Sequence, residues 1–131
     1  MKKGVLAGLM MTLLVFSCQN TSKDGISLIT SKELQELKQK GDVQLVDVRT
    51  PEEYKAAFID GFQNIDYLSA SFNSDVEKLD KTKPIIVYCK SGGRSADCAA
   101  VLKEKGFVQI FDLDGGIAQW RYDGFEVKSL Q

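Results

Sequence analysis

Short apolar runs alternate with amphipathic stretches along most of the 131-residue chain. The apolar runs are rich in Val and Ile and are bounded by Gly, Pro, Asp or Asn, which is the pattern of β-strands. Strands are predicted over residues 26–29, 43–48, 62–65, 85–89 and 108–111. The run over 85–89 is β-branched and uninterrupted, which makes it the strongest strand prediction in the chain.

Helices are predicted between these strands. Three stretches show the capping-box spacing, a Thr or Ser three residues before a Glu. They are Thr30 with Glu33, Thr50 with Glu53, and Ser74 with Glu77. Two more helical patterns cover residues 95–105, ended by Gly106, and 117–121, after a turn at 114–116. The chain therefore has a helical segment after nearly every predicted strand.

This alternation predicts an α/β fold with a mainly parallel sheet of about five strands and helices on both faces. The adjacent Leu45 and Val46 indicate burial on both faces of their strand. Ligands of such sheets bind beyond the carboxyl ends of the strands. Residues that follow a predicted strand are thus the first candidates for a functional site.

Composition excludes several kinds of chemistry. The formal net charge is −1 and no basic run follows Lys2-Lys3, so we expect no nucleic-acid partner. The chain contains no histidine, which removes His-assisted nucleophiles and His-containing metal sites. The cysteines at positions 18, 89 and 98 do not have the spacing of metal ligands. We therefore expect neither a metal nor a cofactor.

The first residues have the pattern of a secretory signal. Lys2-Lys3 precedes an uncharged stretch over 4–17, too short to cross a bilayer comfortably. Residues 15–18 (V-F-S-C) resemble the lipobox of bacterial lipoproteins, which predicts cleavage before Cys18 and lipidation of its sulfur. A plain signal peptide with an unrelated Cys is the alternative. We expect a signal peptide over 1–17, a tether over 18–26 and a domain over 27–128, anchored in a bacterial cell envelope, facing the periplasm or the outer surface.

The best candidate for chemistry is the stretch C-K-S-G-G-R over 89–94, between the strand over 85–89 and the helix over 95–105. A thiol at a helix N-terminus faces unpaired backbone N–H groups, which lower its pKa. Gly92 and Gly93 are expected to turn the backbone with positive φ, and Arg94 adds a fixed positive charge. The alternative is a loop that contains a small buried Cys.

Four ordered segments resemble the rhodanese family of sulfurtransferases. They are L-V-D-V-R with P-E-E-Y over 45–54, I-D-G with N-I over 59–65, C-K-S-G-G-R-S over 89–95, and L-D-G-G with Trp120 over 113–120. The family commonly has Gly-His where this chain has Ala57-Phe58, a change expected to alter packing more than chemistry. The resemblance implies a three-layer rhodanese-like fold over 27–128.

The resemblance also implies a mechanism. Cys89 would take a sulfane sulfur from a small anionic donor such as thiosulfate, carry it as a persulfide, and pass it to cyanide, a thiol or a protein cysteine. Four residues separate Cys89 from Arg94, whereas related phosphatases and arsenate reductases have one more, so the spacing favours sulfur. A persulfide carrier or binding module for a partner protein is the alternative. We expect a monomer.

Several residues keep two interpretations. The cradle of the sulfur is expected to comprise Lys90, Ser91, Gly92, Gly93, Arg94 and Ser95. Arg94 either orients the loop or attracts the donor, Lys90 either steers anions or is solvated, and Ser91 either donates its hydroxyl or shapes the turn. Asp47 and Arg49 are expected to form a supporting ion pair, with direct substrate contact by Arg49 as the alternative. Cys98 is either buried or a resolving cysteine.

Overall fold

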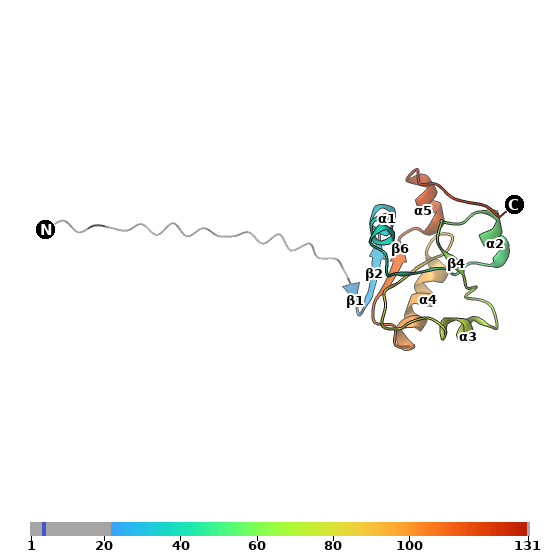
Figure 1. Ribbon diagram of the computed structural model, residues 1–131, viewed down its shortest axis with the longest axis horizontal. Coiled ribbons are helices and arrows are strands. Elements are labelled where there is room, and N and C mark those ends of the chain that lie inside the picture. Colours follow the sequence, from blue (N-terminus) through green and yellow to red (C-terminus); the bar gives the residue numbers. More distant parts are fainter. Residues whose placement is uncertain (1–3, 5–21, 131) are drawn as a thin grey trace.

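A six-stranded sheet forms the centre of the protein in a computed structural model that describes residue 4 and residues 22–130 (Figure 1). The strand order is β1-β2-β6-β5-β3-β4, in which β1 is antiparallel to β2 and the other five strands are parallel. The strands are β1 (Ser22–Lys23), β2 (Ile26–Ile29), β3 (Gln44–Asp47), β4 (Gln63–Asn64), β5 (Ile85–Tyr88) and β6 (Ile110–Leu113). The predicted parallel sheet of five strands is confirmed.

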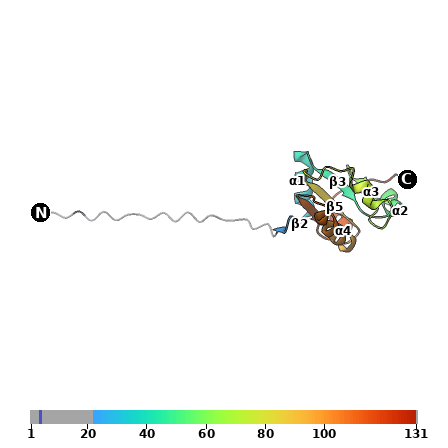
Figure 2. The ribbon, with the colours of Figure 1, turned by 90° about the horizontal axis from the view of Figure 1, so that it is seen from below.

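Helices cover both faces of this sheet. They are α1 (Ser31–Lys40), α2 (Pro51–Ala56), α3 (Phe72–Val76), α4 (Gly93–Glu104) and α5 (Gly116–Tyr122). Leu34 of α1 and Trp120 of α5 pack with Ile86 on one face, and Cys98 of α4 packs with Val87 on the other. Figure 2 accordingly shows α1 and α4 on opposite sides of β5. The α/β class with helices on both faces is confirmed.

The capping boxes of the first two helices form as predicted, and the third does not. Thr30 and Thr50 each accept from the N–H of the Glu three residues later, whose carboxylate accepts from the N–H of the Thr. Ser74 instead lies inside α3, which begins after Ser71, and its hydroxyl donates to the Ser71 carbonyl. Phe72 and Val76 are apolar and buried, and a spacing of four residues puts them on the same face of a helix. The burial of these two side chains therefore decides that the helix covers 72–76.

Three other differences concern where an element begins. Helix α4 begins at Gly93, two residues early, because helical backbone follows directly after the turn at Gly92. Strand β6 begins two residues late, at Ile110, because Val108 is exposed and does not pair with β2. Ser22 and Lys23, placed in the predicted tether, form β1 and pair with β2, so the sheet begins inside that segment.

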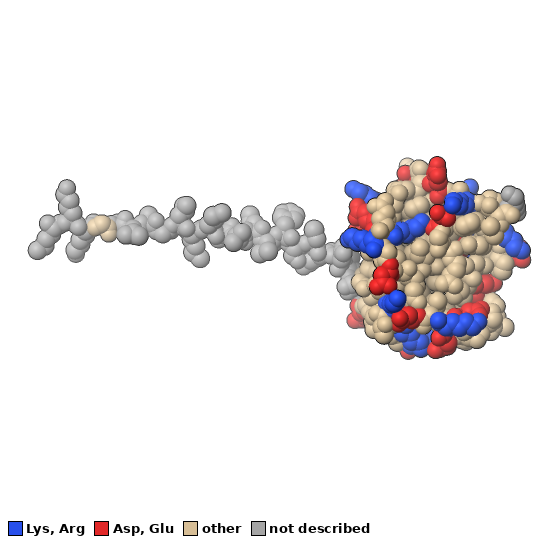
Figure 3. Space-filling model, in the orientation of Figure 1, with Lys and Arg blue, Asp and Glu red and all other residues tan. Residues whose placement is uncertain are grey.

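Apart from residue 4, the predicted signal segment over 1–17 lies outside the described residues, as does the candidate lipidation site Cys18. Among the residues that are described, no helix is long and apolar enough to cross a membrane. On the face shown in Figure 3, acidic and basic residues are interspersed around a broad uncharged area. This mixture agrees with the small net charge of the chain.

Candidate active site

Cys89 lies at the carboxyl end of β5, where the chain leaves the sheet and turns into α4. All four residues of β5 are buried, and Cys89 itself is only 1% exposed. The N–H of Gly92 donates to the Cys89 Sγ over 3.1 Å. This contact requires the backbone to fold back over the sulfur, and Gly92 permits it with a φ of +113°. The predicted positive φ at Gly93 is wrong, because Gly93 is already the first residue of α4.

The loop makes Cys89 a stronger acid than an ordinary thiol. Burial raises its pKa, but hydrogen bonds from Ser95, Gly92 and Ser91 together outweigh burial and bring the pKa below its usual value. Ser95 acts through both its hydroxyl and its backbone, whereas the other two residues act through backbone N–H groups. These groups belong to the loop and the first turn of α4, so the positive end of that helix faces the sulfur.

Helix α5 holds the loop from the other side. The N–H groups of Ile117 and Ala118 donate to the carbonyl oxygens of Cys89 and Lys90, each over 3.0 Å. Gly116 makes this approach possible, because a Cβ on it would lie 2.6 Å from the backbone of Lys90 and would also overlap the Cys89 carbonyl. The turn over 114–116, which the sequence predicts only as a turn, is therefore a structural support of the site.

Arg94 joins the loop to α2. Its Nη1 and Nη2 donate to the two carboxylate oxygens of Glu53 over 2.7 and 2.8 Å. The hydrogen bond from Arg94, helped by Thr50, lowers the pKa of Glu53 to about 2. The same carboxylate also accepts from the Thr50 N–H as part of the capping box. Of the two interpretations of Arg94, the geometry favours a clamp that fixes the loop.

A buried polar network lies under the other flank of the loop. The Arg49 Nη2 pairs with the Asp47 Oδ2 over 2.6 Å and donates to the Ala57 carbonyl over 2.6 Å. Tyr88, immediately before Cys89, donates its hydroxyl to the same Asp47 oxygen over 2.6 Å. Burial and the charge of Asp47 raise the pKa of Tyr88, which keeps its hydroxyl protonated as a donor. The Asp47–Arg49 pair thus supports the site through Tyr88.

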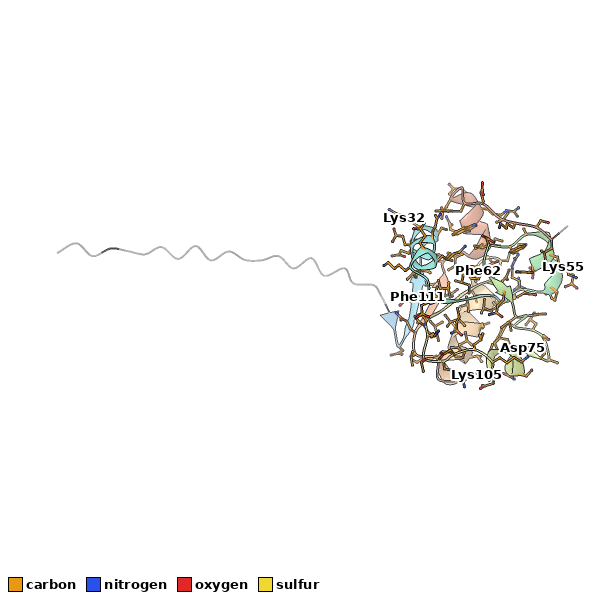
Figure 4. The ribbon with its side chains drawn as sticks, viewed as in Figure 1. Lys32, Lys55, Phe62, Asp75, Lys105 and Phe111 are labelled. Atoms are coloured by element: carbon orange, nitrogen blue, oxygen red, sulfur yellow. The ribbon has the colours of Figure 1, made fainter. Side chains whose placement is uncertain are left out.

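Aromatic packing completes that flank. Phe62 lies edge-on to the ring of Tyr88 with 4.8 Å between ring centroids, in the interior of the molecule (Figure 4). Phe58, which stands where the family commonly has His, is 8% exposed and stacks on Tyr54 at 4.6 Å. Phe58 therefore serves packing at this position. Trp120 is buried and donates its ring N–H to the Glu126 carbonyl over 2.8 Å.

The remaining candidates lie either at the surface or deep in the core. Lys90 and Ser91 are exposed on the outer side of the loop. Cys98 is a fully buried free thiol, and burial, with Asp112 and Cys89 nearby, raises its pKa to about 12. These properties favour the interpretation of Cys98 as a core residue. Within the described part of the chain, no three His, Cys, Asp or Glu side chains are grouped as metal ligands would be.

The sequence predicts the loop, but not three of its supports or a buried acid near it. Glu53 was predicted only as a capping residue, and its second partner, Arg94, lies 41 positions along the chain. Tyr88 was predicted only as a strand residue, and the first turn of α5 only as a helix start. Asp112, a buried acid in β6, was not singled out at all. The one available signal was a charged residue inside an apolar run, F-D-L over 111–113.

Comparison with known proteins agrees with this geometry. The family model described as "Rhodanese-like domain" matches residues 30–123. The chain is 34% identical over 93 residues to a thiosulfate sulfurtransferase GlpE of Ectopseudomonas mendocina, covering 71% of this chain and 83% of that protein. It is 37% identical over 95 residues to a probable adenylyltransferase/sulfurtransferase MoeZ of Mycobacterium tuberculosis, covering 72% of this chain but only 24% of that protein.

A solved structure agrees with the fold as well. The rhodanese-related protein of Thermoplasma volcanium superposes with a TM-score of 0.68 at 29% identity, over 79% of this chain and 97% of that chain. The expected rhodanese-like fold is therefore confirmed.

The ion pair between Arg94 and Glu53 predicts a pH-dependent contribution to stability. The folded pKa of Glu53, about 2, lies below its ordinary value of 4.5, so the contribution is present above pH 4.5 and is lost as the pH falls towards 2. We expect Glu53→Gln to be less stable than the wild type at pH 7, with the difference shrinking between those two pH values. Urea unfolding at a series of pH values measures this.

The exposed Glu52, on the same turn of α2, provides the matched control. Glu52→Gln should change stability little at every pH. If the stability lost in Glu53→Gln stays constant down to pH 2, the ion pair is not the cause of that loss.

Gly116 predicts a steric effect on the site. With a φ of +61° and no room for a Cβ, Gly116→Ala should destabilise the fold by about 3 kcal/mol and displace α5 from the loop. Gly124→Ala is the control, because Gly124 has a φ of +85° but open space around it, so only the backbone strain of about 1 kcal/mol applies. Urea unfolding and the alkylation rate of Cys89 report both effects. Equal losses of stability in Gly116→Ala and Gly124→Ala would contradict the close approach of Gly116 to the backbone of Lys90.

Proposed function

The chain belongs to the rhodanese-like domain family, and from that premise we propose that it is a sulfurtransferase that carries a sulfane sulfur as a persulfide on Cys89. The observation that carries this proposal is the environment of the sulfur. Backbone N–H groups of the loop and the hydroxyl of Ser95 lower the pKa of Cys89, although no imidazole is present in the chain. A site built to stabilise a negative sulfur suits a persulfide as well as a thiolate.

The reaction proceeds in two displacements. The Cys89 thiolate attacks the outer sulfur of a donor such as thiosulfate, the sulfur–sulfur bond of the donor breaks, and sulfite leaves with the bonding pair. A nucleophilic acceptor, cyanide or a thiolate, then attacks the outer sulfur of the persulfide and the Cys89 thiolate leaves. Neither displacement requires a proton to be removed by the protein. The pair of steps therefore needs a stabilised anion and no general base.

A cavity next to the loop supports a small anionic donor. It has a volume of about 270 Å³ and is lined largely by apolar atoms of Ala56, Ala57, Ile117 and Ala118, among others. The other four lining residues are charged. Arg49 and Glu53 are paired with Asp47 and Arg94, whereas Lys90 and Arg121 are exposed and form no ion pair with a described residue. Cations at the mouth of an apolar cavity attract a small anion, which favours the steering interpretation of Lys90.

A persulfide carrier for a partner protein is the second candidate function. It shares the first displacement and differs in the acceptor, a cysteine of the partner. The 1% exposure of Cys89 favours small acceptors over a protein surface. A phosphatase or arsenate reductase is the third candidate, and the four-residue spacing from Cys89 to Arg94 argues against it.

The test is the mass of the protein after exposure to thiosulfate. We expect the wild type to gain one sulfur atom on the tryptic peptide that contains Cys89, and to lose it on addition of cyanide with formation of thiocyanate. Cys89→Ser should gain no sulfur and form no thiocyanate, whereas Cys98→Ser should behave as the wild type.

Thiocyanate formation by Cys89→Ser at the wild-type rate would refute the mechanism. A persulfide that forms on Cys89 but is not removed by cyanide or a small thiol would identify a persulfide carrier for a partner protein. Hydrolysis of an aryl phosphate without sulfur loading would identify a phosphatase.

We further propose that the protein is anchored in a bacterial cell envelope by lipid on Cys18, which the lipobox-like residues 15–18 support. Metabolic labelling with a fatty acid should mark the wild type and Cys98→Ser but not Cys18→Ala. The labelled protein should fractionate with membranes. A wild-type protein without label and free of the membrane fraction would disprove the anchor.

A further inference from the structure

Arg49 keeps one unused nitrogen although its side chain is nearly closed off from solvent. Its Nε donates to both carboxylate oxygens of Asp47, over 2.9 and 3.1 Å. Its Nη2 donates to Asp47 and to the Ala57 carbonyl, each over 2.6 Å. Among the described residues, nothing accepts a hydrogen bond from the third nitrogen, Nη1. A residue that is only 4% exposed therefore has two N–H donors left for another molecule.

The unused nitrogen opens into the cavity beside the loop. In the described part of the chain, the Oδ1 of Asp112 is the only fully enclosed side-chain oxygen or nitrogen that lacks a partner. The Nη1 of Arg49 lacks a partner as well, so it must reach solvent. Arg49 lines the cavity of about 270 Å³, and Asp47 and Ala57 occupy the other two nitrogens of its guanidinium. We conclude that Nη1 faces this cavity.

The charges around the cavity favour an anion. Arg49 and Glu53, which both line it, each belong to an ion pair and so add no net charge as pairs. Lys90 and Arg121 also line it, are exposed, and form no ion pair with a described residue. The cavity thus combines two surplus positive charges with a fixed guanidinium donor. Donors of this kind suit the oxygens of a carboxylate.

The size and walls of the cavity favour an organic anion over an inorganic one. At roughly 30 Å³ for a water-sized group, the cavity has room for about nine such groups, and an ion of the size of thiosulfate would fill roughly half of it. Ala56, Ile117 and Ala118 supply apolar walls. A short hydrocarbon stem next to the carboxylate would cover these walls. Lys90, the neighbour of Cys89 in the chain, places the other end of the cavity at the loop.

We propose that this cavity binds the sulfur acceptor, and that the Nη1 of Arg49 donates to a carboxylate of that acceptor while Lys90 and Arg121 attract it. The acceptor is then a small thiol that carries a carboxylate on a short apolar stem. The inference rests on the proposed persulfide chemistry at Cys89. In addition to its support of Tyr88 through Asp47, Arg49 becomes a specificity-determining residue.

The transfer to such an acceptor is the second displacement of the proposed reaction. The acceptor thiol loses its proton to water, and its thiolate attacks the outer sulfur of the Cys89 persulfide. A new bond forms between these two sulfurs, and the bond from the outer sulfur to Cys89 Sγ breaks with its electron pair left on Cys89. The products are the persulfide of the acceptor and the free Cys89 thiolate. The sulfane sulfur changes carrier, so no further oxidant or reductant is needed.

The kinetic experiment compares two acceptors that differ in charge. The full chain receives thiosulfate with either 3-mercaptopropionate or its neutral analogue 3-mercapto-1-propanol, and the release of sulfite is measured. We expect the wild type to have a KM about tenfold lower for the carboxylate thiol, as expected for one charge-assisted hydrogen bond, with similar kcat. A wild type with equal KM values for the two acceptors would overturn the proposal.

Variants assign the preference to the cavity. Arg49→Lys keeps the positive charge but loses the fork of donors, so it should bring the two KM values together. Arg121→Gln and Lys90→Gln should each reduce the ratio of the KM values about threefold. Lys55→Gln is the matched control, because Lys55 is an exposed cation of α2 that does not line the cavity, and its ratio should stay near tenfold. An equal reduction in Lys55→Gln and Arg121→Gln would contradict the proposal.

A binding measurement on the wild type covers the case in which Arg49→Lys fails to fold. The ¹⁵N-labelled protein is titrated at constant ionic strength with butyrate, which has a methyl group in place of the thiol, or with the neutral butyramide. We expect butyrate to shift the Nε–H resonance of Arg49 in a saturable way and butyramide to shift it far less. No shift with butyrate, or an equal shift with butyramide, would overturn the proposal.

Butyrate has no sulfur, so this measurement separates the two hypotheses. Saturable binding of butyrate at Arg49 in a protein that forms no persulfide would refute the proposed function and leave the carboxylate site standing. A persulfide that forms normally in a protein without butyrate binding would refute the carboxylate site alone.

Discussion

The central contact of the site is the hydrogen bond from the Gly92 N–H to the Cys89 sulfur, and the surrounding residues hold the loop in the shape that this bond requires. It exists only while a short loop folds back over the end of β5, and an isolated loop of that length would not hold this shape. Three supports fix it: the first turn of α5 binds the carbonyls of Cys89 and Lys90, Glu53 clamps Arg94, and Asp47 holds Tyr88. Each comes from a different part of the chain, so the sulfur is stabilised by the whole fold and not by the loop sequence alone.

This arrangement explains how a chain without histidine can still activate a thiol. Backbone N–H groups have fixed dipoles and do not titrate, so they favour the anion over the whole range of pH in which the fold persists. They act on a thiolate and on the outer sulfur of a persulfide alike, because both are anions at the same helix N-terminus. Burial disfavours the charged sulfur, and the balance between burial and hydrogen bonds sets the pKa of Cys89.

Much of the fold could be predicted from local patterns. Strand β5 and the capping boxes at Thr30 and Thr50 depend on residues within one element, where spacing and side-chain type determine the outcome. The candidate loop at Cys89 was found for the same reason. The pairing of Arg94 with Glu53 could not be predicted, because which helix lies across from the loop depends on the packing of the sheet. Ser74 misled the prediction, since the buried Phe72 and Val76 decided where α3 begins.

The structure of the sulfur-loaded protein tests the central claim most directly. If the loop is a cradle for an anionic sulfur, thiosulfate-treated crystals will show the outer sulfur bonded to Cys89 Sγ and within hydrogen-bonding distance of backbone N–H groups of residues 90–95. The loop itself will keep its conformation, with Arg94 still on Glu53. An outer sulfur that points away from those N–H groups, or a loop that must open and release Arg94 to hold it, would contradict the account.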